Sequence, residues 1–471
     1  MIKLIIEKEL RDIIGSTKFA LTFGVCSILI LLSFYVGGRN YQISRQQFEA
    51  GKRENLRKLE GITDWMEVRN FRIFLPPQPI TSLVMGVSND IGRNTDVRGR
   101  GELNAEDSRY GEDPVYAIFR FLDLEFVFQI ILSLFAILFA YDAINGEKER
   151  GTLRLTFANP VPRKSFILGK MAGSFLSLSL PLLVPILLGG LILIVMGIPM
   201  ESADWTRLAF IVVAGFLYFG AFLGLSLLLS SLTERSSSSF LFLLVAWILS
   251  VMIIPRTAVL LAGRAVAVPT VDEIASQKSR YSASLWQEDR RKMADFRVDD
   301  KIPANEMLQS FQKFMSQLSE DREKKMNELA ARLNEDRSNK QRVQERIAFG
   351  LACLSPSAVF SLASDEISGT GIRLKNLYKQ QAERYQNAYA EFMKGKTGMN
   401  PGGGFVFRIN TNEQDQKKEP INSNEIPEFQ FAVSPIAESF GLMAVYFGLL
   451  VLFNLVFFLG AFVSFLRFDV R

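Results

Sequence analysis

The chain of 471 residues contains no histidine and only two cysteines. The absence of histidine excludes a Ser-His-Asp triad, imidazole ligation of a metal ion and the histidine-based helix motif of zinc proteases. Cys26 falls inside an apolar run and Cys353 lies in a distant polar region. A structural disulfide or a cysteine-based metal site is therefore not expected. No catalytic residue and no metal ligand are predicted.

A phosphate-binding loop is missing too. No segment follows the Gly-x-x-x-x-Gly-Lys-Ser/Thr pattern, and the stretch from Gly86 to Arg93 has the wrong spacing and lacks the final Lys-Ser/Thr pair. The formal net charge of +5 gives no reason to expect nucleic acid as a partner. Acidic pairs such as Asp299-Asp300 fit a solvated helix face. ATP hydrolysis through this type of loop is excluded.

Long apolar runs are abundant. Hydrophobic residues make up 48% of the chain and charged residues 22%, so the charge must be concentrated outside the apolar runs. Six runs are long enough to cross a hydrocarbon core of about 30 Å. Because backbone groups in lipid need internal hydrogen-bond partners, each run is predicted to be a helix. The predicted spans are 19–36, 124–141, 166–197, 208–232, 238–261 and 440–466.

The first 18 residues form a separate element. Isoleucines fall on one face of a predicted helix over residues 2–14 and charges on the other, which indicates a cytoplasmic amphipathic helix at the membrane interface. The alternative is a terminal extension with no role at the membrane interface. No small-residue cleavage pattern follows the first apolar run, so we expect it to stay attached. Basic short segments and an even helix count place both termini, including the tail 467–471, in the cytoplasm.

This topology leaves two long polar segments on the extracytoplasmic side of the membrane. Residues 37–120 carry proline-rich and glycine-rich charged tracts, which predict an extended, loosely ordered segment with local helix. Residues 262–437 predict a helical domain. After Pro303, its stretch up to Ile347 has no further proline or glycine and has the spacing of a long amphipathic helix. We expect it to form an antiparallel hairpin with a helix over 371–394, joined by a connection, 354–363, that touches the membrane surface.

A charged loop, residues 142–165, separates the second and third spans. Its carboxylates and arginines offer charge-assisted contacts to a partner, its glycines allow a sharp turn, and its prolines stiffen the return. The same charges also fit a simpler role, in which they only orient the neighbouring helices. The candidate contact residues are Asp142, Gly146, Glu147, Glu149, Arg150, Gly151, Thr152, Pro160 and Arg163.

This loop resembles the signature of type-2 ATP-binding-cassette (ABC-2) permeases. Its acidic residues followed by Gly-Thr-Leu, the Pro-Val-Pro-Arg turn ending at Arg163, and the Gly-Lys pair at Lys170 all match that signature. The amphipathic N-terminus and the six spans match the family as well. The enlarged segment before the last span is similar to permeases of multicopper-enzyme maturation or gliding-type export.

The resemblance implies an all-α integral membrane protein that serves as the permease subunit of an exporter, with residues 142–165 as its coupling loop. Such a subunit has no ATPase site and binds no cofactor; a separate ABC ATPase subunit uses ATP and Mg. The implied partners also include a second permease chain, membrane lipid and an extracytoplasmic partner. The implied location is the bacterial inner membrane, with several passes.

Polar residues within the spans are few, and they are candidates for a translocation path. Hydrogen bonding between helices or interfacial capping explains the same residues. These candidates are Glu125, Gln129, Ser133, Tyr218, Ser226 and Asn454.

Two other classes of function remain open. A membrane-anchored scaffold would recruit extracytoplasmic partners through the helical hairpin without transport, and no substrate would stimulate an associated ATPase. A membrane enzyme would have to rely on carboxylates alone, such as those of Asp123 and Glu125.

Overall fold

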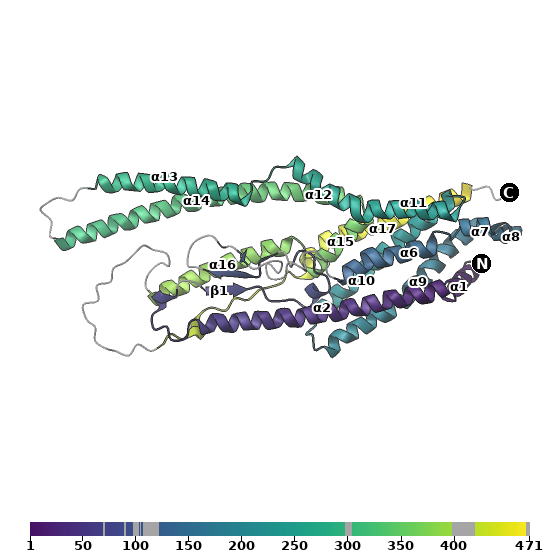
Figure 1. Cartoon of the computed structure of the whole chain (residues 1–471), viewed down its shortest axis with the longest axis horizontal. Helices are drawn as coiled ribbons and strands as arrows, with labels where there is room; N and C mark the ends of the chain where they lie inside the picture. The colour runs from purple at the N-terminus through teal and green to yellow at the C-terminus, as the bar shows by residue number, and fades with distance from the viewer. Residues whose placement is uncertain are drawn as a thin grey trace.

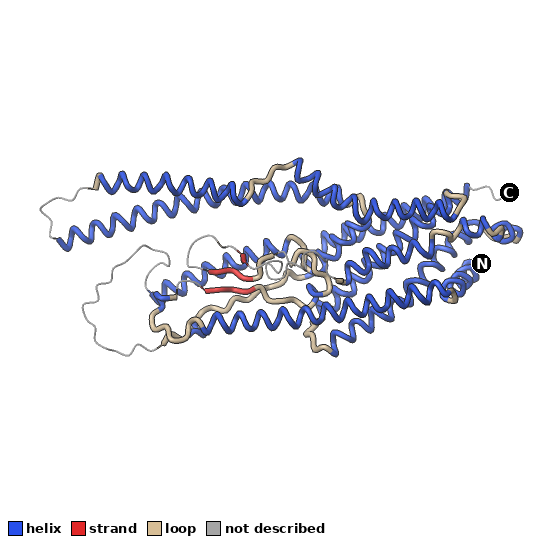
Figure 2. The backbone as a smooth tube through the Cα atoms, in the orientation of Figure 1, coloured by secondary structure: helices blue, strands red, loops and turns tan. Residues whose placement is uncertain are grey.

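The computed structural model describes residues 1–68, 71–88, 91–97, 103, 105–106, 122–296, 304–397 and 420–467, except for the side chains of 304–308 and 436–439. The molecule is elongated (Figure 1). A helical bundle at one end carries both termini, and a small sheet and long helices form the other end. Helix dominates throughout (Figure 2).

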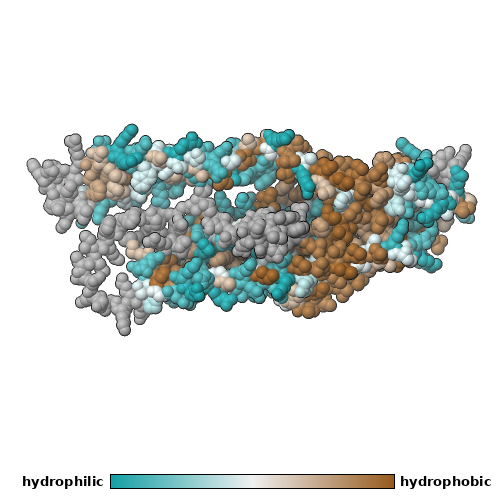
Figure 3. All heavy atoms as spheres, viewed as in Figure 1, coloured by the Kyte–Doolittle hydropathy of each residue, from teal (hydrophilic) through white to brown (hydrophobic). Residues whose placement is uncertain are grey.

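Among the described residues, six helices are long and apolar enough to cross a membrane. A broad band of apolar side chains covers this part on the face shown in Figure 3. The prediction of an all-α membrane protein with six spans is confirmed. The spans are built from α2 (Thr17–Arg57), α5 (Leu124–Phe126) with the π-helical η3 (Val127–Leu132) and α6 (Ser133–Ala140), α9 (Arg163–Val195), α10 (Ser202–Leu232), α11 (Ser236–Ile248) with the π-helical η4 (Leu249–Ile253) and α12 (Ile254–Ala265), and α17 (Ile436–Arg467).

Close approach between the spanning helices depends on glycine. A Cβ atom on Gly189 of α9 would come within 2.3 Å of the Phe34 ring of α2. A Cβ atom on Gly215 of α10 would come within 2.4 Å of the Phe128 ring. Since real Cβ atoms do not approach other atoms so closely, only glycine allows these large rings to fill the spaces between the helices.

The helix predicted over residues 2–14 is present as α1 (Ile2–Ile14). It packs along α9. A Cβ atom on Gly169 would lie 2.8 Å from Cβ of Ile5, and one on Gly173 would lie 2.7 Å from Cβ of Glu9. These two glycines, one helical turn apart, bring the backbones of α1 and α9 close together. The N-terminal helix is therefore fixed to a spanning helix.

Residues 37–120 are more ordered than predicted. Helix α2 runs on to Arg57, and three antiparallel strands follow in the order β1-β2-β3. Ile73 and Val97 are buried with Tyr385 and Tyr389 of the covering helix α16. The prediction of a loose segment was wrong for these residues because their apolar partner lies about 300 positions further along the chain. The remaining glycine-rich tract lies mostly outside the described residues. The elements are β1 (Phe71–Phe74), β2 (Asn94–Val97), β3 (Ala105–Glu106), η1 (Trp65–Glu67), η2 (Ile80–Ser82), η5 (Ser423–Glu425) and α16 (Arg373–Thr397).

The long amphipathic helix is present as α14 (Ala304–Ala352), but its predicted partner was wrong. It pairs with α13 (Val271–Ala294), and its C-terminal part lies along α12. We call the α13 and α14 pair the arm; it extends away from the bundle at the top of Figure 1. The Arg322 guanidinium stacks over Trp286 at 3.8 Å and pairs with Asp289. Helix α16 is not free to pair because its tyrosine face covers the sheet.

The connection 354–363 was expected at the membrane surface, and this was also wrong. Most of it belongs to α15 (Pro356–Ser368), which packs between α10 and α17. Phe360 is fully buried and its ring stacks on Tyr218 at 5.0 Å. The apolar face of α15 therefore buries itself in the bundle, where it contacts protein in place of lipid headgroups.

Candidate functional site

The loop between the second and third spans folds into two short helices, α7 (Asn145–Glu149) and α8 (Thr152–Ala158). They lie at the end of the molecule that carries both termini (Figure 1). Gly151 joins them with a φ of +72°, in the left-handed region that favours glycine. We call residues 145–158 the elbow. Its position between α6 and α9 means that both neighbouring spans are joined through it.

The inner side of the elbow is fixed to the turn between α10 and α11 through Asn145, which is fully buried. Its amide Nδ2 donates to Thr233 Oγ1 at 3.0 Å, and its Oδ1 accepts from the Ser230 hydroxyl at 3.0 Å, with the Ser236 hydroxyl oxygen 3.3 Å from the same Oδ1. Ser230 Oγ in turn accepts from the backbone N–H groups of Ile144 and Asn145. Such a buried hydrogen-bond network holds its members in one arrangement.

Two further contacts join the elbow to the same turn. The Lys148 ammonium donates to the carbonyl oxygen of Ser231 at 3.0 Å. The Glu149 carboxylate accepts from the backbone N–H of Ser236 at 2.8 Å and from its hydroxyl at 2.9 Å. Because Ser236 begins α11, Glu149 caps that helix, where negative charge is favourable. The elbow is therefore joined to the start of the fifth span.

A chain of four charges links the elbow to α1 and α9; we call it the ion chain. Lys170 of α9 is only 4% exposed, and its Nζ lies 3.0 Å from a carboxylate oxygen of Glu9 and 3.0 Å from one of Glu147. Lys8 Nζ lies 3.1 Å from the same oxygen of Glu147. A buried ammonium between two carboxylates is tolerated because its charge is compensated on both sides. The ion chain therefore joins three helices at one point.

The outer side of the elbow is open to solvent. Arg150 and Thr152 are exposed, and Leu155 is 69% exposed on α8. Asn159 and Pro160 continue the exposed surface toward α9. We call these five residues the outer face. It combines a guanidinium, polar groups and one aliphatic side chain, a composition suited to a protein partner.

The candidate loop residues therefore divide between two sides. Arg150, Thr152 and Pro160 belong to the outer face, whereas Glu147 lies in the ion chain and Glu149 caps α11. The other candidates have internal contacts. Gly146 is buried, its N–H donates to the carbonyl oxygen of Asp142 at 2.9 Å, and Arg163 donates to the carbonyl oxygen of Leu466 at 3.0 Å.

Sequence reasoning missed the residues that hold the inner side. Lys170 was noted only as part of the family signature, and Glu9 and Asn145 were not proposed. Their signal was present in the sequence. Lys170 is a lone charge in an apolar run, and Glu9 falls between Ile5 and Ile13 on the apolar face of the helix predicted over residues 2–14. A charge that breaks an apolar pattern favours a buried partner.

Four of the six candidate path residues come together at α15. Gln129 Nε2 donates to Ser357 Oγ at 2.8 Å, and the Tyr218 hydroxyl donates to the Gln129 carbonyl oxygen at 2.9 Å. Ser361 donates to Glu125, and Ser133 Oγ accepts from the Trp247 indole at 2.8 Å. These side chains form hydrogen bonds between the second, fourth and fifth spans and α15.

The other two candidates, Ser226 and Asn454, make hydrogen bonds elsewhere in the bundle. Ser226 donates to the Phe222 carbonyl oxygen one turn earlier on α10. Asn454 of α17 donates to the Leu217 carbonyl oxygen at 2.8 Å, beside Gly220. All six candidates therefore make hydrogen bonds that hold helices together or satisfy a local carbonyl, as expected for polar groups inside a bundle.

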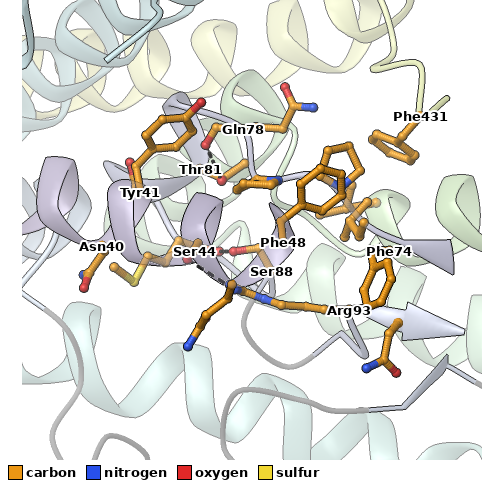
Figure 4. A pocket seen from close by; sticks show the side chains of 18 of the residues that line it. Asn40, Tyr41, Ser44, Phe48, Phe74, Gln78, Thr81, Ser88, Arg93 and Phe431 are labelled. Atoms are coloured by element: carbon orange, nitrogen blue, oxygen red, sulfur yellow. Dashed lines mark hydrogen bonds between the residues drawn. The ribbon is translucent and has the colours of Figure 1, made fainter. Parts of the chain in front are cut away.

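Two cavities lie where the bundle meets the sheet and α16, with volumes of about 390 Å³ and about 1040 Å³. Figure 4 shows side chains that line the smaller one. None of the six path candidates lines either cavity. Among the residues that the structure describes, no group of three or more cysteine, aspartate or glutamate side chains is placed to hold a metal ion.

Comparison with known proteins agrees with this architecture. A family model described as "ABC-2 family transporter protein" matches residues 4–470. One similar protein is the "Probable ABC transporter permease protein NosY" of Stutzerimonas stutzeri, 34% identical over 125 residues. That match covers 26% of this chain and 45% of NosY, so the chain spans less than half the length of this relative. Since the family model covers nearly the whole chain, the protein belongs to the ABC-2 family of transporter proteins.

Proposed function

We propose that this chain is the permease subunit of an ATP-binding-cassette exporter, driven by a separate ATPase subunit that binds ATP and Mg. The chain itself would bind no cofactor. The elbow carries this proposal. It exposes Arg150 and Leu155 while its inner side is joined to three other parts of the bundle. Because a partner can contact the exposed side while the inner side is fixed to the bundle, the elbow is suited to transmit movement of the partner to the spanning helices.

The contacts on the inner side of the elbow define which helices such a movement would reach. Through Glu147 and Lys170 it reaches α1 and α9, and through Asn145 it reaches the turn between α10 and α11. Movement of the elbow would therefore shift four helices together. We propose that two permease chains, identical or different, work as a dimer and that their bundles rock against each other.

The orientation follows from the same proposal. An ATPase that uses cellular ATP must meet the elbow in the cytoplasm, which places both termini there and the sheet and arm outside, in a bacterial inner membrane. The apolar, charge-poor bundle favours an amphipathic substrate or the transmission of force over transport of an inorganic ion. The projecting arm is the part best placed to bind an extracytoplasmic partner (Figure 1).

The proposed contact predicts that the outer face is needed to retain the ATPase. The permease is purified with a tag from its native membrane, and a copurifying chain with a phosphate-binding loop is identified by mass spectrometry. Changing Arg150→Glu together with Leu155→Asp should lower the copurified ATPase at least tenfold, because both charge and apolar contact are lost. The matched control makes the same kinds of change on the exposed arm, Lys313→Glu with Phe311→Asp. Equal amounts of ATPase with both double variants would show that the outer face is not the contact.

The proposed orientation predicts opposite labelling at the two ends of the molecule. In a background in which Cys26 and Cys353 are replaced by alanine, a membrane-impermeant maleimide added to sealed cells should label Glu335→Cys on the arm and not Thr152→Cys in the elbow. Both positions are exposed, so accessibility within the protein does not differ. Permeabilised cells, in which both should react, are the control. Labelling of Thr152→Cys in sealed cells would reverse the orientation.

A further inference from the structure

The larger cavity lies at the junction of the bundle with the sheet and α16. Its volume of about 1040 Å³ is at the upper end of the range found for small-molecule sites. Its walls come from α2, η2, the start of α10, the end of α15 and the start of α16. The smaller cavity of about 390 Å³ adjoins it, because Tyr41, Gln78, Thr81, Leu374 and Phe431 line both. The two form adjacent chambers around shared side chains.

Negative charge dominates the larger chamber. Four carboxylates and two guanidinium groups line it, a formal charge of −2. These charged groups have partners within the protein on both sides of the charge balance. Asp204 Oδ2 accepts from the backbone N–H of Glu201 at 3.1 Å, and Asp365 Oδ1 accepts from the Thr370 hydroxyl at 3.3 Å. Arg373 pairs with Glu366 at 2.6 Å, and the buried Arg207 donates to the carbonyl oxygens of Ser434 at 2.8 Å and Ile367 at 3.4 Å. A cation inside this chamber would therefore be attracted. The carboxylates are Glu201, Asp204, Asp365 and Glu366.

The carboxylates of the larger chamber come in two pairs from two helices. They come from the start of α10 and the end of α15, and they belong to no group of three that could hold a metal ion among the described residues. An inorganic cation needs several oxygen ligands at about 2–2.6 Å. An organic cation has no such requirement, since it takes hydrogen bonds and charge from separate sides of a wide space. The distribution therefore favours a larger, organic cation.

The smaller chamber offers an apolar and aromatic surface. Phe48, Phe74 and Pro76 line it, and Tyr41 and Phe431, which also line the larger chamber, add their rings (Figure 4). Aromatic faces attract ammonium groups as well as apolar bodies. Arg93 also lines the smaller chamber, where its guanidinium donates to Ser44 Oγ at 3.3 Å. Its positive charge disfavours a second cation there, so the charged end of a ligand belongs in the larger chamber.

We propose that these chambers bind an amphipathic organic ammonium ion. The ammonium group lies among the carboxylates of the larger chamber, and the aromatic or aliphatic body extends past Tyr41 and Phe431 into the smaller one. This site does not depend on coupling to an ATPase, so it stands or fails separately from the proposed exporter function.

The test uses the full chain in phosphatidylcholine nanodiscs and two dyes with the same xanthene ring. Rhodamine 6G is a cation and fluorescein an anion, and fluorescence anisotropy gives the Kd of each, with empty nanodiscs subtracted. Rhodamine 6G should bind saturably and fluorescein at least tenfold more weakly. The triple variant Asp204→Asn, Asp365→Asn, Glu366→Gln should raise the Kd for rhodamine 6G at least tenfold, because it removes three of the four negative charges.

The control variant removes three exposed carboxylates far from the chambers, Glu328→Gln, Glu335→Gln and Glu391→Gln, and should leave the Kd within twofold. A second cavity variant, Asn376→Trp, fills the larger chamber from α16 without changing charge and should also abolish binding. Each variant must elute as a single species in size exclusion. Equal affinity for both dyes, or unchanged rhodamine 6G binding in both cavity variants, would overturn the proposal.

Discussion

Replacing Lys170 with methionine will release α1 from the bundle and uncouple the elbow from α9. The substitution keeps a long unbranched side chain but removes the cation between Glu9 and Glu147, which lies 3.0 Å from each. Glu9 is then left as a buried carboxylate without its cation. Removing one member of a buried ion pair costs about 3–5 kcal/mol. We expect a large fall in the melting temperature and rapid tryptic cleavage at Lys8 or Arg11, with loss of ATPase coupling.

Two variants make this result specific. Lys164→Met makes the same change at an exposed position of the same helix and should leave melting and protease protection unchanged. Adding Glu9→Gln to Lys170→Met removes the stranded carboxylate, and should recover part of the lost stability. Unchanged melting and unchanged protection of α1 in Lys170→Met alone would show that the ion chain does not hold these helices together.

Removing the arm will abolish the physiological output while leaving the bundle intact. The position of the cut is defined by a contact in the retained chain. Gln344 Nε2 donates to the Val266 carbonyl oxygen at 3.5 Å, so the chain segments on either side of the excised residues lie close together. Replacing residues 269–341 with a short Gly/Ser linker preserves α15 and α16, which belong to the bundle and the sheet. A complementation assay in a strain lacking the permease should fall to the level of an empty vector, because long insertions outside a core serve mostly recognition.

The internal control for the arm is the ATPase itself. If the bundle folds normally, the amount of ATPase that copurifies with the shortened chain should equal that of the full chain. Full complementation by the shortened chain would show that the arm is dispensable. Loss of both complementation and ATPase would show that the arm is needed for folding, contrary to its position outside the bundle (Figure 1).

The spanning helices could be predicted because their signal is local. The length and polarity of a run such as Phe440 to Leu466 can be read from that run alone, without knowledge of any other part of the chain. The arm, the sheet and α16 could not be predicted so well, because each of these elements could pack against several partners that lie far away in the sequence. Three helices, α13, α14 and α16, carry apolar stripes, and the sequence did not show that the tyrosines of α16 would cover a sheet. The short strands were missed for the same reason.

The elbow shows the same division. Its position followed from the charges and glycines within residues 142–165, and three of the five outer-face residues, Arg150, Thr152 and Pro160, were among the candidates. Its inner contacts did not, because each joins residues that lie far apart in the sequence. Asn145 meets Ser230 across 85 positions, and Lys170 meets Glu9 of the first helix. A lone polar residue in an apolar run indicates that a partner exists, but only the packing of the helices identifies it.

The claim that the elbow is the contact of an ATPase is tested most directly by photo-crosslinking at Leu155. Benzoylphenylalanine placed there, on an exposed apolar site of the outer face, should give a permease–ATPase adduct on irradiation of native membranes. The same group at Met66, exposed at the opposite end of the molecule, should give no such adduct. An adduct at Leu155 alone is the predicted result. No ATPase adduct at Leu155, with the benzophenone shown to be incorporated, would contradict it.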